Sequence, residues 1–147
     1  MPAGDYYLVL ENYSDSKDAE YEFKVNFSKV SNYEKEFNDS VQSANPISIG
    51  AQISGSIQDG NDEDFYSFHL DKSGTLSLTA KTKEDSSWYY EIVDGSGKTL
   101  QYMYTPYDNV TAEEVTKTVS LPAGKYYIKI DNYSNSIFQE YSFSVKK

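Results

Sequence analysis

Two stretches of the sequence are near-copies of each other: Pro2–Val25 reads PAGDYYLVLENYSDSKDAEYEFKV, and Pro122–Val145 reads PAGKYYIKIDNYSNSIFQEYSFSV. They align without a gap, 120 positions apart, with 13 of 24 residues identical. Each copy runs from a Pro-Ala-Gly turn through an alternating apolar segment, an Asn-Tyr-Ser turn and a second alternating segment. Because a period of two is typical of strands, each copy predicts a β-hairpin with an extended loop.

The spacing of the two copies predicts the domain organisation, since a repeat of this length corresponds to one whole domain. We predict that residues 1–29 are the closing hairpin of a preceding repeat, and that residues 30–147 form one complete domain. An isolated hairpin is marginally stable in water. Residues 1–29 are therefore expected to pack on an edge of the same domain, or on a second molecule as a strand-swapped or edge-paired dimer.

Short alternating segments recur between the two copies, and no segment shows a sustained helical period. Their spacing is typical of a β-sandwich, and turn signals such as Asp59-Gly60-Asn61 and Lys72-Ser73-Gly74 separate them. The predicted fold is all-β, a jelly-roll-like antiparallel β-sandwich. Strands are expected at 53–57, 65–70, 75–81, 88–93, 99–104 and 115–121, followed by a last hairpin in which 126–130 faces 141–145.

Composition excludes several classes of function. The formal charge of -10 disfavours binding to nucleic acid or to an anionic membrane surface. Cys is absent, so neither a disulfide framework nor a thiolate metal site can form. No apolar run is long enough to span a membrane, and no basic-then-apolar leader opens the chain, so a signal for export is expected upstream.

Catalysis finds little support in the sequence. The single His, His69, alternates with Tyr66, Phe68 and Leu70 and should point outward from its strand. No HExxH or GxSxG pattern occurs. The chain is therefore expected not to be an enzyme.

Acidic and amide side chains gather in two places. In an extended segment, alternate residues lie on one side roughly 6.6 Å apart; these are Glu34, Glu36 and Asn38, with Asp39 at the corner. A glycine-containing loop before a strand carries Asp59, Asp62 and Asp64. Calcium takes six to eight oxygen ligands, and six carboxylates brought together would repel one another without a cation. From the residues alone, these clusters are either solvated acidic loops or a calcium site.

Several ordered motifs resemble the bacterial pre-peptidase C-terminal (PPC) domain family, which includes the collagen-binding domains of clostridial collagenases. The motifs are Glu34-x-Glu36-x-Asn38-Asp39-Ser40, Ala44-x-Pro46-Ile47 with Gly50, Gly55-x-Ile57, Asp62-x-Asp64-Phe65-Tyr66 and Leu121-Pro122-Ala123-Gly124-x-Tyr126-Tyr127. Phe37 stands where relatives commonly have Pro. The resemblance implies a sandwich appended to secreted enzymes, often in tandem and often calcium-binding. It favours Ca²⁺ as the cofactor, held by Glu34, Glu36, Asn38, Asp39, Asp59, Asp62 and Asp64.

The expected function is that of a non-catalytic, calcium-binding accessory domain of a secreted or cell-surface bacterial enzyme, a protease. Its expected partners are adjacent repeats and the catalytic domain of the parent protein. One alternative is an extracellular polymer-binding module for collagen or carbohydrate, using surface aromatic residues; the candidates are Trp88, Tyr89, Tyr102, Tyr104, Tyr107, Tyr127 and Tyr133. Against it, Trp88 falls on an inward-facing pattern. Another alternative is a repeat subunit of a surface assembly.

Overall fold

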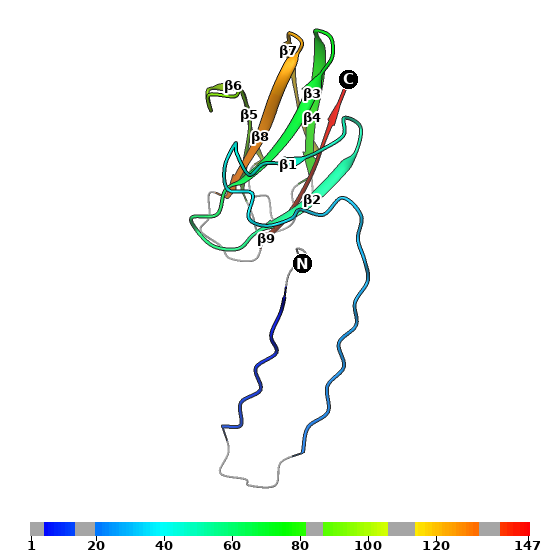
Figure 1. Cartoon of the computed structure of the whole chain (residues 1–147), viewed down its shortest axis with the longest axis vertical. Helices are drawn as coiled ribbons and strands as arrows, with labels where there is room; N and C mark the ends of the chain where they lie inside the picture. The colour runs from blue at the N-terminus through cyan, green and yellow to red at the C-terminus, as the bar shows by residue number, and fades with distance from the viewer. Residues whose placement is uncertain (1–4, 14–19, 82–86, 106–113, 133–138) are drawn as a thin grey trace.

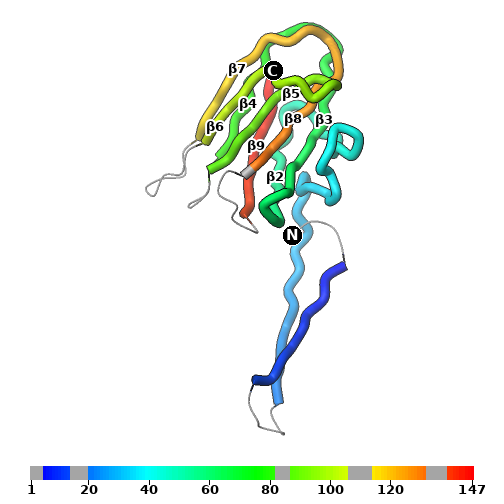
Figure 2. Tube along the Cα trace, turned by 90° about the vertical axis from the view of Figure 1, so that its left-hand side faces the viewer, coloured from blue at the N-terminus to red at the C-terminus, as the bar shows by residue number. Residues whose placement is uncertain are grey.

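Two β-sheets form the body of the molecule in the computed structural model, which describes residues 5–13, 20–81, 87–105, 114–132 and 139–147. The five-stranded sheet has the order β1 (Asn45–Pro46), β3 (Asp64–Leu70), β8 (Gly124–Asn132), β5 (Trp88–Val93) and β6 (Thr99–Thr105). The four-stranded sheet has the order β2 (Gln52–Ile57), β9 (Gln139–Lys146), β4 (Gly74–Lys81) and β7 (Glu114–Leu121). Figures 1 and 2 show the two layers.

The predicted antiparallel β-sandwich is confirmed. The paired strands run antiparallel, apart from β1, which pairs with β3 in parallel. The strands predicted between residues 53 and 145 all lie within observed strands, with ends extended by at most a few residues. Only the two-residue β1 was missed, because Pro46 and the short length leave no alternation to read. The described part of the chain contains no helix, and so none that could cross a membrane.

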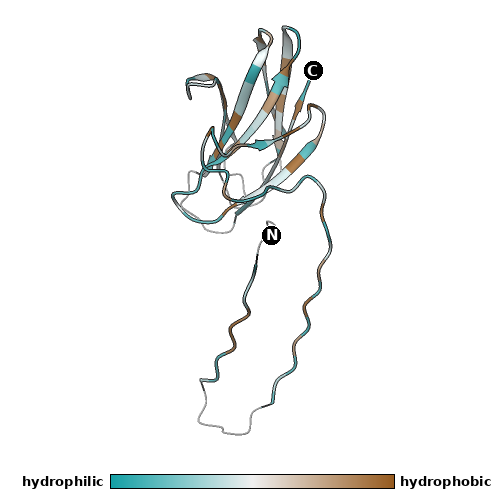
Figure 3. Cartoon of the chain, viewed as in Figure 1, coloured by the Kyte–Doolittle hydropathy of each residue, from teal (hydrophilic) through white to brown (hydrophobic). Residues whose placement is uncertain are grey.

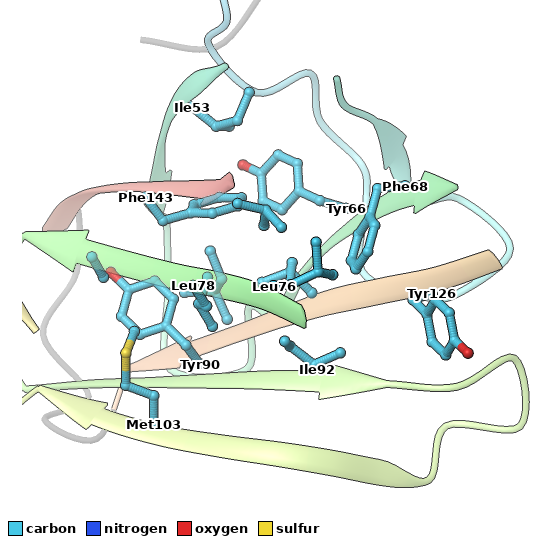
Figure 4. Close-up of a cluster of buried hydrophobic side chains, with 14 of the residues drawn as sticks. Ile53, Tyr66, Phe68, Leu76, Leu78, Tyr90, Ile92, Met103, Tyr126 and Phe143 are labelled. Atoms are coloured by element: carbon cyan, nitrogen blue, oxygen red, sulfur yellow. The ribbon is translucent and has the colours of Figure 1, made fainter. Parts of the chain in front are cut away.

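The core lies between the inner faces of the two sheets (Figure 4). Alternation along β4 buries Leu76, Leu78 and Ala80 while the residues between them are more exposed. In β5 the same rule buries Trp88 and Tyr90 completely. Removing such apolar surface from water stabilises a fold by about 25 cal/mol per Å², and this burial explains why the period-two pattern identified the strands.

A second, smaller cluster lies on the outer face of the five-stranded sheet. Phe65, Val93 and Tyr127 are buried there, with Val41 and Ala44 packed against them. Residues 40–44 form a turn that covers this face, closed by a hydrogen bond from Ser43 N to Ser40 O of 3.1 Å. The sequence pattern predicts Tyr127 as a surface residue, and this prediction is wrong because Tyr127 is buried in this cluster.

The predicted closing hairpin is wrong in its pairing. β8 pairs with β3 and β5, whereas β9 pairs with β2 and β4 in the opposite sheet. Each is an inner strand of its own sheet, and the two face each other across the core. Alternation specifies which face of a strand is buried and leaves its hydrogen-bond partner open, so consecutive strands with short connections were read as a hairpin.

The N-terminal segment leaves the sandwich as an extended arm, formed by residues 5–13 and 20–30 (Figures 1 and 2). Neither described part of the arm is a strand, so residues 5–13 and 20–29 do not pair with each other as the predicted hairpin requires. Its nearest sequence equivalents, β8 and β9, do not pair with each other either, which explains why the arm lacks a ladder of its own. Its origin in a preceding repeat and its dimerisation remain predictions.

Candidate metal centre

Residues 33–39 connect the arm to the sandwich and carry the first acidic cluster. The segment is tied to β2 because Glu34 N donates to Ser54 O at 2.9 Å and Ser54 N donates to Asn32 O at 3.0 Å. Asn45 holds it from the other side: its Oδ1 accepts from Lys35 N at 2.9 Å, and its Nδ2 donates to Lys35 O at 2.8 Å. The backbone that presents the acidic side chains is thus fixed.

An inner group of acids forms where this segment meets the start of β3. One carboxylate oxygen from each of Glu34, Glu36 and Asp64 lies within 4.8 Å of the others. Glu34 and Asp64 are buried, and Glu36 is half-buried. Glu34 Oε1 accepts hydrogen bonds from Ser56 N at 2.6 Å and from Ser56 Oγ at 3.1 Å. Three acids therefore share one small volume that is partly closed to water.

An outer group shares Glu36 with the inner group. Oxygens of Glu36, Asp39 and Asp62 lie within 4.8 Å of one another. Gln58 orients two of them, because its Nε2 donates to Glu36 Oε1 at 2.6 Å and its backbone N donates to Asp62 Oδ2 at 2.5 Å. A surface cavity of about 220 Å³ opens onto this group. An ion with bound water can reach the acids through that cavity.

Two buried oxygen atoms lack a hydrogen-bond partner: Oδ1 of Asp64, which belongs to the inner group, and Oδ1 of Asn38. Both residues have no exposed surface. The Asn38 backbone is held by a hydrogen bond from Phe65 N to Asn38 O of 2.9 Å, and its Nδ2 donates to Phe65 O at 3.4 Å. A buried polar atom without a partner costs about 1–3 kcal/mol. These oxygens fit a hard cation, which prefers carboxylate and amide oxygen ligands.

Two tyrosines complete the inner group, and sequence reasoning missed both. The Tyr141 hydroxyl of β9 lies 2.8 Å from Glu34 Oε2 and 2.5 Å from Asp64 Oδ2. The Tyr66 hydroxyl of β3 lies 2.5 Å from that of Tyr141 and 3.3 Å from Glu34 Oε2. Two hydroxyl protons satisfy only two of these four contacts. The available signal was that a buried tyrosine needs a partner for its hydroxyl.

Gly55 of β2 leaves the room that this arrangement needs. A Cβ atom at this position would collide with Glu34 Oε2 and with the Tyr141 hydroxyl and ring. Gly55 pairs directly with Tyr141 across the β2–β9 ladder, so the collision cannot be relieved by a shift of side chain alone. The glycine is required for the close approach of Glu34 to the sheet.

Burial raises the pKa of the clustered acids. The pKa of Asp64 rises from 3.8 to about 9 because of desolvation and then the nearby Glu34 charge. Desolvation also raises the pKa of Glu36 from 4.5 to about 7, and the charges that add to it belong to Glu34, Asp62 and Asp39, all of them acids. The pKa values of Glu34 and Asp62 are raised by the same burial. Without a cation, the inner group holds a proton at neutral pH.

Most of the predicted ligands are brought together, with one exception. Glu34, Glu36 and Asp64 converge in the inner group, and Asp39 and Asp62 join Glu36 in the outer group. Asn38 is buried and is hydrogen-bonded to Phe65, the residue that follows Asp64. Asp59 only lines the cavity, and its Oδ1 accepts a hydrogen bond from Asn61 N at 2.8 Å within its own turn. The neighbouring Glu63 pairs with Lys129 at 2.7 Å, outside the centre.

The predicted aromatic surface is reduced to three tyrosines. Tyr102 and Tyr104 of β6 are exposed, and Tyr89 of β5 packs between them with ring centroids 5.5 Å and 5.1 Å away. Trp88 is buried in the core and Tyr127 is buried against Phe65, so neither can contact a polymer. Tyr107 and Tyr133 lie outside the described residues.

Comparison with known proteins gives two informative matches. Collagenase ColT of Clostridium tetani is 24% identical over 139 residues, which covers 89% of this chain and 13% of the collagenase. The solved pre-peptidase C-terminal domain of a Bacillus anthracis collagenase is 23% identical, with a TM-score of 0.56 over 70% of this chain and 94% of that domain. No family model matches the chain.

The fold and the structural match define a β-sandwich domain, and this chain spans 13% of the length of the collagenase that it matches. Its resemblance to the pre-peptidase C-terminal domain is confirmed, because the sequence relative is a clostridial collagenase and the matching structure is such a domain.

Gly55→Ala is expected to destabilise the domain by about 2–4 kcal/mol, as overpacking at a closed backbone contact does. Chemical denaturation followed by fluorescence measures the change. Gly95→Ala is the matched control, since a Cβ at Gly95 meets nothing within 4 Å. Equal denaturation midpoints for the two variants would show that Gly55 is not a required close contact.

Stability without metal is expected to fall as pH rises from about 4 to 9. Below pH 4 the acids are protonated in both states; above it the unfolded chain loses protons that the folded chain keeps on Asp64 and Glu36, whose pKa values are raised to about 9 and about 7. Melting temperature in chelator measures this slope. Asp64→Asn should flatten it, and a slope unchanged by that substitution contradicts the assignment.

Proposed function

We propose that this chain is a calcium-stabilised, non-catalytic accessory domain of a larger exported bacterial enzyme. The observation that carries the proposal is the group of Glu34, Glu36 and Asp64 carboxylates within 4.8 Å of one another, in which Asp64 Oδ1 is buried and unpartnered. The buried Oδ1 of Asn38 is unpartnered as well. The donor set consists of oxygens alone, which suits Ca²⁺ rather than zinc or copper. The match to a collagenase and to a collagenase accessory domain supports a parent enzyme of the protease type.

Glu34, Glu36, Asn38, Asp62 and Asp64 would hold the ion, with Asp39 closing the exposed side. Bound calcium neutralises acids that otherwise repel one another or keep protons. The chain's own residues then gain a fixed geometry: the segment before β1 is fastened to the loop after β2 and to the first residue of β3. The ion thereby sets the direction in which the arm leaves the sandwich.

An exported setting suits such a site. Extracellular calcium modules bind with dissociation constants of roughly 0.1–1 mM, so they fill outside the cell and remain empty in the cytosol. The metal would then stabilise the domain where it works. In that role the domain spaces, stabilises or targets the enzyme to which it is attached, and its adjacent repeats and catalytic domain are its partners.

Calcium is expected to raise the melting temperature, and chelator to lower it. At free calcium about 100 times the dissociation constant, binding contributes about 2.7 kcal/mol, or roughly 10 °C for a domain of this size. Glu36→Gln should weaken binding at least about tenfold, because Glu36 belongs to both acidic groups. Glu63→Gln is the matched control, since Glu63 pairs with Lys129. A melting curve indifferent to calcium in the unaltered chain defeats the proposal.

A second function is favoured by the cluster of three tyrosines on the outer face of β5 and β6. Tyr102 and Tyr104 are exposed with the Tyr89 ring packed between them, and such rings bind flat or ridged polymers such as sugars or a collagen triple helix. In this reading, the accessory domain also anchors its enzyme to an extracellular polymer.

Retention on insoluble collagen fibrils or cellulose tests the second function. The unaltered chain should be retained on one of them, and Tyr102→Ala/Tyr104→Ala should lose that retention without a change in melting temperature. Tyr13→Ala serves as a control, because Tyr13 is exposed in the arm, away from β5 and β6. If the unaltered chain is retained on neither material, the second function is contradicted and only the structural role stands.

A further inference from the structure

The arm exposes an unusual number of large apolar side chains. Figure 3 shows brown, hydrophobic positions at intervals along both parts of the arm, below the sandwich. The exposed set comprises Tyr6, Tyr7, Leu8, Val9, Leu10, Tyr13, Tyr21, Phe23, Val25, Phe27 and Val30. A contiguous apolar surface of this kind marks an interaction site in a soluble protein.

The arm repeats the two strands that fill the centre of the sandwich. Residues 5–12 correspond to β8 and residues 19–26 correspond to β9 at the constant offset of 120 positions. In β8 and β9 the six core-facing residues are Tyr126, Ile128, Ile130, Tyr141, Phe143 and Val145, each at most 7% exposed. Their equivalents in the arm are Tyr6, Leu8, Leu10, Tyr21, Phe23 and Val25, each at least 46% exposed.

The copy preserves the buried face and varies the other face. Four of the six core-facing residues are identical in the arm, and the other two exchange Ile for Leu. Most outward positions differ, for example Lys129, which corresponds to Val9, and Ser144, which corresponds to Lys24, although Tyr127 and Glu140 are kept as Tyr7 and Glu20. A segment kept for solubility or for linker length would not keep the core face. The arm therefore carries the information to occupy the inside of a sandwich.

Two strands of the β8 and β9 type cannot complete each other's backbone hydrogen bonds. β8 needs β3 and β5 as neighbours and β9 needs β2 and β4, so the two strands contribute to opposite sheets. Each inner strand leaves backbone N–H and C=O groups open on both sides when its neighbours are absent. In this chain the frame made by β1–β7 is already filled by β8 and β9, which leaves the arm outside it.

We propose that the arm is a donor segment: it supplies the β8 and β9 strands to another frame of the same fold, formed by strands equivalent to β1–β7 that are not part of this chain's own sandwich. In that sandwich, Tyr21 stands where Tyr141 stands here, with its hydroxyl at the acidic centre. The donated strands thus complete both the core and the metal centre of the acceptor.

The test uses the β1–β7 frame of this same protein as the acceptor, in a variant whose β9 packs more weakly into that frame. Phe143→Ala loosens β9 in the full chain, and Leu8→Asp/Phe23→Asp removes the apolar face of the arm. In a chain that keeps Phe143, Leu8→Asp/Phe23→Asp should not change the melting temperature, because Leu8 and Phe23 are exposed. In the Phe143→Ala chain the same arm change should lower the melting temperature by several degrees, because the arm there competes with the weakened β9 for its place in the frame.

A disulfide reports where the arm sits. Thr79 of β4 is the direct partner of Ser144 in β9, and Lys24 is the arm's equivalent of Ser144. The chain has no cysteine of its own, so Lys24→Cys/Thr79→Cys introduces a unique pair. Directly opposed strand residues are close enough to form a disulfide. The bond should accumulate in the Phe143→Ala chain, and Leu8→Asp/Phe23→Asp should abolish it.

Size-exclusion chromatography of the oxidised protein then identifies the source of the arm. Linked dimers and longer chains show that the arm enters the frame of another copy and support the proposal. A linked monomer shows that the arm enters only the frame of its own chain and contradicts donation to another frame. Phe143→Leu, which removes less of the core, is tested beside Phe143→Ala, so the result does not depend on one variant remaining folded. The proposal is overturned if no disulfide forms between positions 24 and 79 and if the arm change leaves the melting temperature the same in chains with and without the Phe143 substitution.

Discussion

The structure depends on the placement of like charges in a space that excludes water. Glu34 and Asp64 come from segments 30 residues apart in the sequence, yet their carboxylates share one buried volume with Glu36. Such a group is stable in two ways: it keeps protons, or it binds a cation. The raised pKa values describe the first way, and the proposed calcium ion would be the second. The domain's stability is therefore coupled to the solution around it.

Both sheets contribute to this centre, which couples its integrity to that of the sandwich. Asp64 and Tyr66 come from β3 in the five-stranded sheet, whereas Gly55 and Tyr141 come from β2 and β9 in the four-stranded sheet. The hydrogen bonds between them close one end of the core. A change at the centre is thereby transmitted to the packing of the two layers, and loss of packing opens the centre to water.

Much of this could be predicted from sequence, because burial leaves a clear trace in an alternating strand. The strands around Leu76–Ala80 and Trp88–Ile92 were readable in this way, and the spacing of Glu34, Glu36 and Asn38 indicated a shared face. Alternation does not specify which strands pair with each other, so the sequence predicted a hairpin of β8 and β9 that does not form. Hydroxyl direction left no trace either, and the contact of Tyr141 with Glu34, 107 residues away in the sequence, emerged only from the fold.

The central position of β8 and β9 has a consequence for biosynthesis. Ribosomes release a chain from its N-terminus onward, and here the last strands to emerge are the inner strands of both sheets. Until they arrive, the earlier strands have open edges and half of a core, a condition that promotes aggregation. The fold has high contact order for the same reason, which slows its formation. Nascent chains of this domain should therefore rely on chaperones until translation has passed the final strand.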